Sequence, residues 1–155
     1  MGKGISAGIP RNKPLSSIEE EAFVALLRAA DQLQRRAAEM LKPHGLSPTQ
    51  YNALRILRGA GAEGLACSEV GKRMINRDPD ITRLLDRLER RGLIQRSRGQ
   101  KDRRVIRTQI TSAGIDLLKG LHREVAEFHR RVLGHLGEKR LEPLIRLLEA
   151  ARAGP

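Results

Sequence analysis

The chain has 155 residues, a formal net charge of +12 at pH 7, one cysteine and 2% aromatic residues, so its core must be built from Leu, Ile, Val and Ala. One cysteine excludes an internal disulfide and a cysteine-cluster zinc site, and the lack of a secretory signal or of an apolar run of about 18 residues favours a cytoplasmic protein with no membrane partner. The positive charge favours a polyanion, such as nucleic acid, an anionic membrane surface or an acidic protein.

An irregular basic arm at residues 1–14, rich in glycine and proline, precedes a long amphipathic helix. Ser16 with Glu19, and Ser17 with Glu20, have the spacing of a capping box, which satisfies free N–H groups at a helix start. Apolar residues then recur every three or four positions, which predicts one apolar stripe. The stripe consists of Ile18, Ala22, Leu26, Ala29, Leu33, Ala37 and Met40.

A second helix is predicted at "LSPTQYNALRIL". Ser47 suits the N-cap, Pro48 suits the first helical position, and Gln50 completes a capping box. Leu54 and Leu57 are expected to face the core.

The glycine-rich stretch "RGAGAEG" ends this helix. The next residues, "LAC", predict a short strand, and Ser68 is expected to cap a short helix through about Met74. A packed, unreactive thiol is the expectation for Cys67, because buried cysteines are usually structural.

The next helix has a clear beginning in "RDPDITRLLDRLERRG". Asp78 can cap it, Pro79 fits its first turn, and Asp80 suits the positive end of the helix dipole. Four residues with i, i+3, i+4, i+7 spacing must face the core: Ile81, Leu84, Leu85 and Leu88.

A basic hairpin follows, with strands "LIQRSR" and "RRVIRTQI" around a loop of about four residues, "GQKD". Positive charges crowd its sequence at Arg98, Lys101, Arg103, Arg104 and Arg107. Charge this dense on a folded element indicates a surface that meets an anion. Ile106 and Ile110 share a strand face and are expected to anchor the hairpin, while Asp102 is expected to hold Arg103 or Arg104 in an extended pose.

Two amphipathic helices complete the chain, the first capped by Thr111 and separated from the second by Gly137. The apolar stripe of the first consists of Ile115, Leu118, Leu121, Val125, Phe128, Val132 and Leu136, and that of the second of Leu141, Leu144, Ile145 and Leu148. The outer helices carry more apolar surface than one small core can cover, which indicates a partner chain.

DNA binding is the function that the middle third favours. A helix-turn-helix places its second helix in the major groove, and residues 77–107 carry eleven Lys and Arg against five Asp and Glu, a net charge of +6. For Asp80, which phosphate repels, we favour helix capping or pairing with an arginine over a contact with cytosine. The residues expected to meet DNA are Arg77, Pro79, Asp80, Thr82, Arg83 and Arg87 in the helix, Arg98, Lys101, Asp102, Arg103 and Arg104 in the hairpin, and Ser47, Thr49, Gln50 and Ser68 at phosphate-contacting helix starts.

The stretches "DITRLLDRLERRGLIQR" and "DRRVIRTQITSAG" resemble the winged helix-turn-helix of the MarR family, the multiple-antibiotic-resistance regulators, and "GLSPTQYNALRIL" resembles its second helix. The resemblance covers about residues 18–150 and implies a mainly α fold with a small β-hairpin wing, in which a winged helix-turn-helix is flanked by long dimerisation helices. It also implies a homodimer on double-stranded DNA with a pseudo-palindromic site. Asp102 and Arg104 match the family's wing motif, in which the arginine enters the minor groove and the aspartate orients basic side chains by ion pairing. The stretch "INRDPD" departs from the family pattern.

The expected organisation is therefore a flexible arm (1–14), a helical dimerisation region (15–45 and 112–155) and a winged helix-turn-helix (46–111). The leading hypothesis is a transcriptional regulator, a repressor that a small molecule releases. The alternatives are a sequence-independent architectural DNA-binding protein and a protein-interaction module. Competition with genomic DNA separates the regulator from the architectural protein, because only the regulator should keep one site at physiological salt. The interaction module predicts that Arg104→Ala retains dimerisation and leaves DNA affinity unchanged.

Effector and metal sites have weaker signals. Family members often bind effectors between their two regions, so the resemblance makes His44 and Tyr51 candidates for an aromatic or phenolic effector, although a loop histidine and a packed tyrosine are the simpler interpretation. His122 and His129 are too far apart for one metal without further ligands. No nucleophile or phosphate loop is present, so we expect neither an enzyme nor a cofactor.

Overall fold

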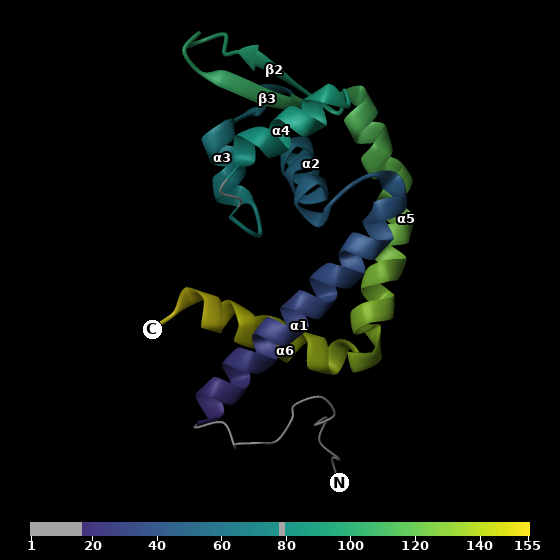
Figure 1. Ribbon diagram of the computed structural model, residues 1–155. Coiled ribbons are helices and arrows are strands. Elements are labelled where there is room, and N and C mark those ends of the chain that lie inside the picture. The colour runs from purple at the N-terminus through teal and green to yellow at the C-terminus, as the bar shows by residue number, and fades with distance from the viewer. Residues whose placement is uncertain (1–16, 78–79) are drawn as a thin grey trace. The chain divides into compact units, whose positions relative to one another are not determined.

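The computed structural model describes residues 17–77 and 80–155, which fall into two units, residues 17–35 and 36–155, described separately here (Figure 1). The second unit contains the three strands and all helices after the first. Outside the described residues lie the predicted basic arm of residues 1–14 and three predicted cap or first-turn residues, Ser16, Asp78 and Pro79.

Helix α1 (Ile18–Leu41) forms as its periodicity predicts, and its last turn belongs to the second unit. The Ser17 hydroxyl accepts the Glu20 N–H at 3.2 Å, as the capping spacing predicts. Leu41 is the one buried residue of this helix. Its exposed large apolar residues are Ile18, Phe23, Leu26 and Leu27.

Helix α2 (Pro48–Ala60) follows the short 3-10 helix η1 (Lys42–His44) and has the predicted capping box. The Ser47 hydroxyl accepts the Gln50 N–H at 3.1 Å, and the Gln50 side-chain oxygen accepts the Ser47 N–H at 3.0 Å. The helix start is therefore satisfied by its own side chains.

After the 3-10 helix η2 (Gly61–Glu63), strand β1 contains only Leu65–Ala66, so the cysteine predicted to lie in it instead begins helix α3 (Cys67–Arg73). The prediction that Ser68 caps α3 is wrong. Ala66 is the N-cap residue, and its N–H donates to the Glu69 carboxylate at 3.3 Å. Because the Glu69 carboxylate accepts the N–H of Ala66 at the end of β1, α3 begins at Cys67, before Ser68.

Helix α4 covers Ile81–Arg90. Asp80 is its N-cap, and the aspartate carboxylate accepts the Arg83 N–H at 3.2 Å. Asp80 therefore satisfies the start of this helix, whereas the predicted cap Asp78 lies outside the described residues.

The hairpin forms from β2 (Ile94–Arg98) and β3 (Ile106–Ile110), and β1 adds to β3, giving an antiparallel sheet of order β1-β3-β2. The register places the first residue of β2 opposite the last residue of β3. The connecting loop covers residues 99–105 and is longer than predicted. Arg103 and Arg104 consequently lie in the loop and not in a strand.

Helix α5 (Ser112–Leu133) leads through the 3-10 helix η3 (Gly134–Leu136) into helix α6 (Glu138–Ala153). The Thr111 hydroxyl accepts the Gly114 N–H at 3.2 Å, which confirms the predicted cap. The described α6 has no buried residue. The predicted stripe of α5 is buried at Leu118, Leu121, Val125, Phe128 and Val132.

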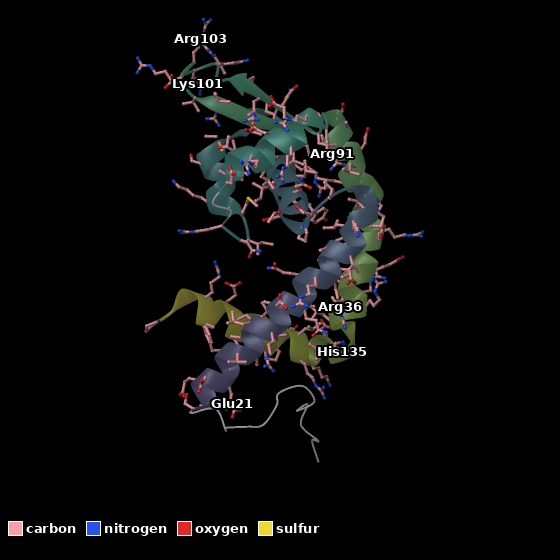
Figure 2. The ribbon with its side chains drawn as sticks, in the orientation of Figure 1. Glu21, Arg36, Arg91, Lys101, Arg103 and His135 are labelled. Atoms are coloured by element: carbon pink, nitrogen blue, oxygen red, sulfur yellow. The ribbon has the colours of Figure 1, made fainter. Side chains whose placement is uncertain are left out.

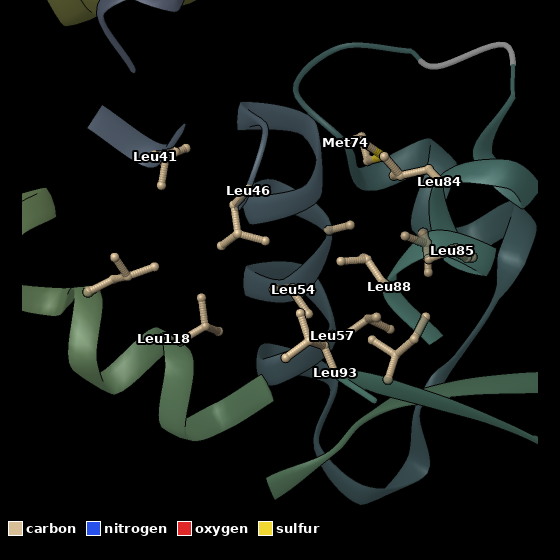
Figure 3. Close-up of a cluster of buried hydrophobic side chains, with 14 of the residues drawn as sticks. Leu41, Leu46, Leu54, Leu57, Met74, Leu84, Leu85, Leu88, Leu93 and Leu118 are labelled. Atoms are coloured by element: carbon tan, nitrogen blue, oxygen red, sulfur yellow. The ribbon is translucent and has the colours of Figure 1, made fainter. Parts of the chain in front are cut away.

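The core of the second unit lies between α2, α4, β2 and α5 and is mainly aliphatic, as the composition predicts (Figure 3). Its most deeply buried large side chains include Leu54, Leu57, Leu85, Leu88, Ile94 and Leu121. Burial of each such side chain stabilises the fold by roughly 1.5–3 kcal/mol. Ile110 packs against this core as predicted, but Ile106 is 56% exposed and does not anchor the hairpin, because it pairs with Arg98 at the end of β2.

Candidate nucleic-acid interface

Helix α4 separates an apolar inner face from a basic outer face. Leu85 and Leu88 are fully buried on the inner face, whereas Arg83 and Arg87 are exposed. Helix α3 packs against α4, as in a helix-turn-helix. The Thr82 hydroxyl lies 3.9 Å from the Cys67 thiol of α3, and Cys67 also packs against the core.

Asp80 serves both of the roles favoured from the sequence. Its Oδ1 accepts the backbone N–H of Arg83 at 3.2 Å, which caps the helix. Its Oδ2 lies 3.2 Å from Nε of the same arginine. Both side chains are largely exposed, and the pair stands at the N-terminal end of the basic face.

The two other acids of α4 are drawn towards strand β2. The Arg96 guanidinium donates to Asp86 and lies 2.9 Å from Oε2 of Glu89, whose other oxygen accepts the Arg96 N–H at 3.2 Å. The hydrogen bond from Arg96 holds the pKa of Asp86 below its usual value of 3.8, and the same bond raises the pKa of Arg96. Because Asp86 and Glu89 are both paired with Arg96 of β2, the charge on the outer face of α4 comes mainly from its arginines.

The prediction from sequence missed Arg96, although a signal was present. Asp86 and Glu89 have i, i+3 spacing and so share one helix face, and a basic strand follows within a few residues. Pairing across to that strand was one way to satisfy them. Residue spacing alone does not separate this pairing from ordinary i, i+4 pairs along the helix.

The hairpin loop has an internal scaffold of hydrogen bonds. The Gly99 N–H donates to the Val105 carbonyl at 2.8 Å, and the Val105 N–H donates to the Asp102 carbonyl at 3.2 Å. The Asp102 carboxylate accepts the Arg104 N–H at 2.9 Å. None of the ion pairs within the described residues includes Asp102, so it fixes Arg104 through the main chain.

Basic side chains project from this loop. Lys101 and Arg103 extend away from the tip (Figure 2), and both side chains are exposed. Arg98 and Arg104 are exposed beside them. Arg107 points elsewhere, because its guanidinium donates to the Gly64 carbonyl at 3.3 Å.

The predicted phosphate contacts at helix starts meet different environments. Ser47 and Gln50 are engaged in their capping box, and the Thr49 hydroxyl lies 2.9 Å from the Ser47 hydroxyl. Ser68 is exposed in the first turn of α3. Arg77 is also exposed, just before the gap in the described chain.

The segment between α1 and α2, residues 42–47, is called the hinge here. It makes hydrogen bonds to two other parts of the chain. The His44 imidazole Nε2 lies 2.8 Å from the Glu124 carboxylate of α5. The Arg91 guanidinium, directly after α4, donates to the main-chain carbonyls of Gly45 at 2.5 Å and His44 at 3.3 Å. One arginine therefore connects the end of α4 with the hinge.

The two effector candidates have separate partners in the described structure. The Tyr51 hydroxyl accepts a hydrogen bond from Arg55 at 3.1 Å, and the ring packs against the core. A surface hollow of about 390 Å³ lies beside the hinge, and neither His44 nor Tyr51 lines it. Its lining residues are Ala38, Glu39, Lys42, Gly45, Leu46, Ser47 and Pro48.

The described part of the chain contains no group of three or more His, Cys, Asp or Glu side chains placed to hold a metal ion. None of its helices is long and apolar enough to cross a membrane.

Comparison with known proteins agrees with this geometry. A family model described as "MarR family" matches residues 46–106. The crystal structure of a MarR transcription factor from Planctomyces limnophilus is 42% identical in sequence, with a TM-score of 0.67, over 88% of this chain and 98% of that one. The HTH-type transcriptional regulator MhqR of Bacillus subtilis is 29% identical over 127 residues, 82% of this chain and 86% of the relative. A mutant MarR of E. coli, solved with operator DNA, shares the fold at 22% identity, with a TM-score of 0.77 over 90% of this chain and 100% of that one.

Proposed function

The chain belongs to the MarR family of transcriptional regulators, and on this premise we propose that it binds one pseudo-palindromic operator as a homodimer and represses transcription until a small molecule releases it. The observation that carries the proposal is the sorting of charge on α4. Asp86 and Glu89 are paired with Arg96, while Arg83 and Arg87 remain exposed. We call α4 the recognition helix, and β2, β3 and the loop of residues 99–105 the wing.

In the proposed complex, recognition has two layers. Basic side chains of the wing and of the recognition helix displace counterions from phosphates, which gives affinity that falls with salt. Side chains at the start of the recognition helix, among them Arg83, then contact base edges in the major groove. Arg104, whose main chain Asp102 holds, is proposed to enter the minor groove next to it.

Selection from a random duplex library tests this proposal. The full-length protein should enrich a sequence with two related half-sites whose centres lie about one helical turn, roughly 10 base pairs, apart. Competition with an excess of genomic DNA should leave that site bound at physiological salt. A sequence-independent architectural protein would enrich no consensus and would lose its site to the competitor.

The homodimer is supported by unpartnered apolar surface on the outer helices. In α6, Ile145 is 59% exposed and Leu147 is 69% exposed, and in α1, Phe23 is 62% exposed and Leu27 is 56% exposed. Exposed apolar residues gathered on whole helices mark interaction surfaces. The proposed division is thus a dimerisation region of residues 15–45 and 112–155 around a DNA-binding region of residues 46–111. Analytical ultracentrifugation at micromolar concentration should find dimers, and a monomer would contradict this arrangement.

The effector step is proposed at the hinge. His44 pairs with Glu124 of α5, and the His44 carbonyl accepts a hydrogen bond from Arg91 at the end of the recognition helix. A small aromatic or phenolic molecule that displaces the His44 side chain, with Tyr51 nearby in sequence, would alter this connection and the spacing of the two recognition helices. The proposal places this regulation in the cytoplasm. Release of labelled operator in a screen of phenolic compounds, lost in His44→Ala, is the expected result.

A further inference from the structure

We infer that Asp80 is a specificity-determining positioning residue, which orients Arg83 so that this arginine reads a guanine in each half-site. The inference rests on the proposed DNA-binding function and adds a base to it. It concerns a carboxylate in "INRDPD", the segment in which the chain departs from the family pattern.

The first step is the grip of one carboxylate on one residue. Oδ1 of Asp80 accepts the backbone N–H of Arg83, and Oδ2 faces its Nε, both at 3.2 Å. The carboxylate therefore fixes the arginine at its main chain and near the end of its side chain. An arginine ordinarily loses much rotamer freedom when it binds, and a side chain held beforehand loses less.

The second step is what this grip leaves available. The ion pair with Asp80 is made at Nε, the guanidinium edge between the two terminal amino groups is not part of that contact, and the side chain is 71% exposed. Two parallel N–H groups at the end of a planar guanidinium match O6 and N7 of guanine in the major groove. The residue is the third of the recognition helix, where helix-turn-helix proteins make base contacts.

The third step is electrostatic. A helix N-terminus normally attracts phosphate, because its free N–H groups and dipole favour an anion. Here the Asp80 carboxylate occupies that position and repels phosphate from it. Arg83 is thus turned from the backbone towards base edges, where a nearby carboxylate does no harm.

Two neighbouring residues of α4 have partners of their own. The Thr82 hydroxyl lies against Cys67 of α3, at 3.9 Å from the thiol sulfur. Asp86, further along the helix, is paired with Arg96 of the wing. Within the described residues, the ion pair with Asp80 is the only one that includes Arg83.

Asp80→Ser separates orientation from capping. A serine at the N-cap still accepts a backbone N–H, so the helix keeps its cap, but it cannot also hold the arginine side chain. We expect an unchanged melting temperature and tighter binding to unrelated DNA, because one negative charge is removed. Discrimination between guanine and the other bases at one position of each half-site should fall about ten-fold. If Asp80 only capped the helix, Asp80→Ser would not lower the discrimination of guanine while it raises the affinity for unrelated DNA.

Arg83→Ala should abolish the preference at that same position and leave the other positions of the consensus unchanged. Arg123→Ala is the matched control, because it removes an exposed arginine that pairs with Glu127 on α5, at 3.4 Å. The control should leave the consensus intact. If Asp80→Ser unfolds, Asp80→Asn supplies a neutral cap of nearly the same shape and should show the same loss of discrimination.

The outcomes separate the inference from the proposed function. If the wild-type protein enriches no consensus from a random duplex library, the proposed function fails. If it enriches one and Arg83→Ala weakens all sequences equally, Arg83 contacts phosphate and the inference is overturned. If Arg83→Ala removes one guanine but Asp80→Ser leaves discrimination unchanged, Asp80 is a helix cap alone.

Discussion

Arg96 of strand β2 and Glu89 of helix α4 are joined through both main chain and side chain. The Arg96 N–H donates to one carboxylate oxygen at 3.2 Å, and its guanidinium lies 2.9 Å from the other. The same guanidinium donates to Asp86. Because one strand residue holds two helix residues, the wing and the recognition helix are fastened together. In the proposed complex with DNA, the position of α4 would therefore set where the loop of residues 99–105 meets the phosphate backbone.

Arg96→Lys is expected to lower the free energy of unfolding by about 1 kcal/mol, because an ammonium cannot reproduce the forked hydrogen bonds to two carboxylates. The effect stays modest because both carboxylates are more than a third exposed, and solvent weakens their attraction. Urea denaturation measures it. Arg123→Lys, at a pair whose arginine is 91% exposed, should have no measurable effect, and equal losses in both variants would contradict a special role for Arg96.

Asp86 gives the fold a defined dependence on pH. The Arg96 hydrogen bond places its folded pKa below the usual 3.8, so its stabilising contribution is present above about that pH and is lost as pH falls through the lowered pKa. Asp86→Asn should therefore be less stable than the wild type at neutral pH. The difference, measured by chemical denaturation at several pH values, should shrink on acidification below 3.8. A difference that stays constant to lower pH would show that the carboxylate charge is irrelevant.

Thr108→Val is expected to stabilise the protein. The Thr108 side chain is fully buried on β3, and its hydroxyl has no hydrogen-bond partner within the described structure. Valine keeps the branched shape that strands favour and removes the unsatisfied hydroxyl, so the free energy of unfolding should rise by about 1 kcal/mol. Loss of stability in urea denaturation would mean that the hydroxyl is satisfied in solution.

Two glycine substitutions should have opposite signs. At Gly64, φ is +65° and an added Cβ would lie 2.5 Å from the Thr108 carbonyl oxygen, so Gly64→Ala should destabilise by roughly 3 kcal/mol. At Gly59, within helix α2, an added Cβ meets nothing within 4 Å, so Gly59→Ala should stabilise by roughly 0.5–1 kcal/mol. Thermal unfolding of both variants is the measurement, and equal shifts would refute the close approach of Gly64 to β3.

The wing makes a prediction in salt dependence. We expect a less steep salt dependence in two tip variants, Lys101→Ala and Arg103→Ala. If each side chain contacts one phosphate, the negative slope of log affinity against log salt should lose about 0.9 of its magnitude in each variant. Binding to all DNA sequences should weaken alike. Arg107→Ala is the control inside the same hairpin, since its guanidinium binds the Gly64 carbonyl. Fluorescence anisotropy from low to high salt tests all three. An unchanged slope in both tip variants would remove the loop from the DNA interface.

Local chemistry made much of the fold predictable. The Ser47 and Gln50 capping box and the buried Leu85 and Leu88 follow from residue type and spacing alone. Errors arose where two residues competed for one role. Glu69 reached the start of α3 and displaced Ser68 as its cap.

The remaining differences concern the hairpin and the pairing of the acids of α4. The hairpin loop is longer than expected because the Gly99 N–H and the Val105 carbonyl close it with a hydrogen bond. Ile106 is exposed because the core does not extend to that end of the sheet. In the candidate site, the basic face of α4 was predictable from the sequence. The pairing of Asp86 and Glu89 with Arg96 was not, because it depends on how β2 packs beside α4.

Arg91 reaches the hinge through two carbonyl oxygens of the main chain, those of His44 and Gly45. Every amino acid supplies such a carbonyl, so substitution of His44 removes its side chain without removing the acceptor. Descendants of this chain can therefore exchange that side chain, and with it the molecules they respond to, while inheriting the same linkage to the recognition helix. Gly45 is the constrained partner, with φ of +67° and the Arg91 guanidinium 3.2 Å from where a Cβ would stand. Substitution should accordingly preserve the linkage to Arg91 at His44 and strain it at Gly45.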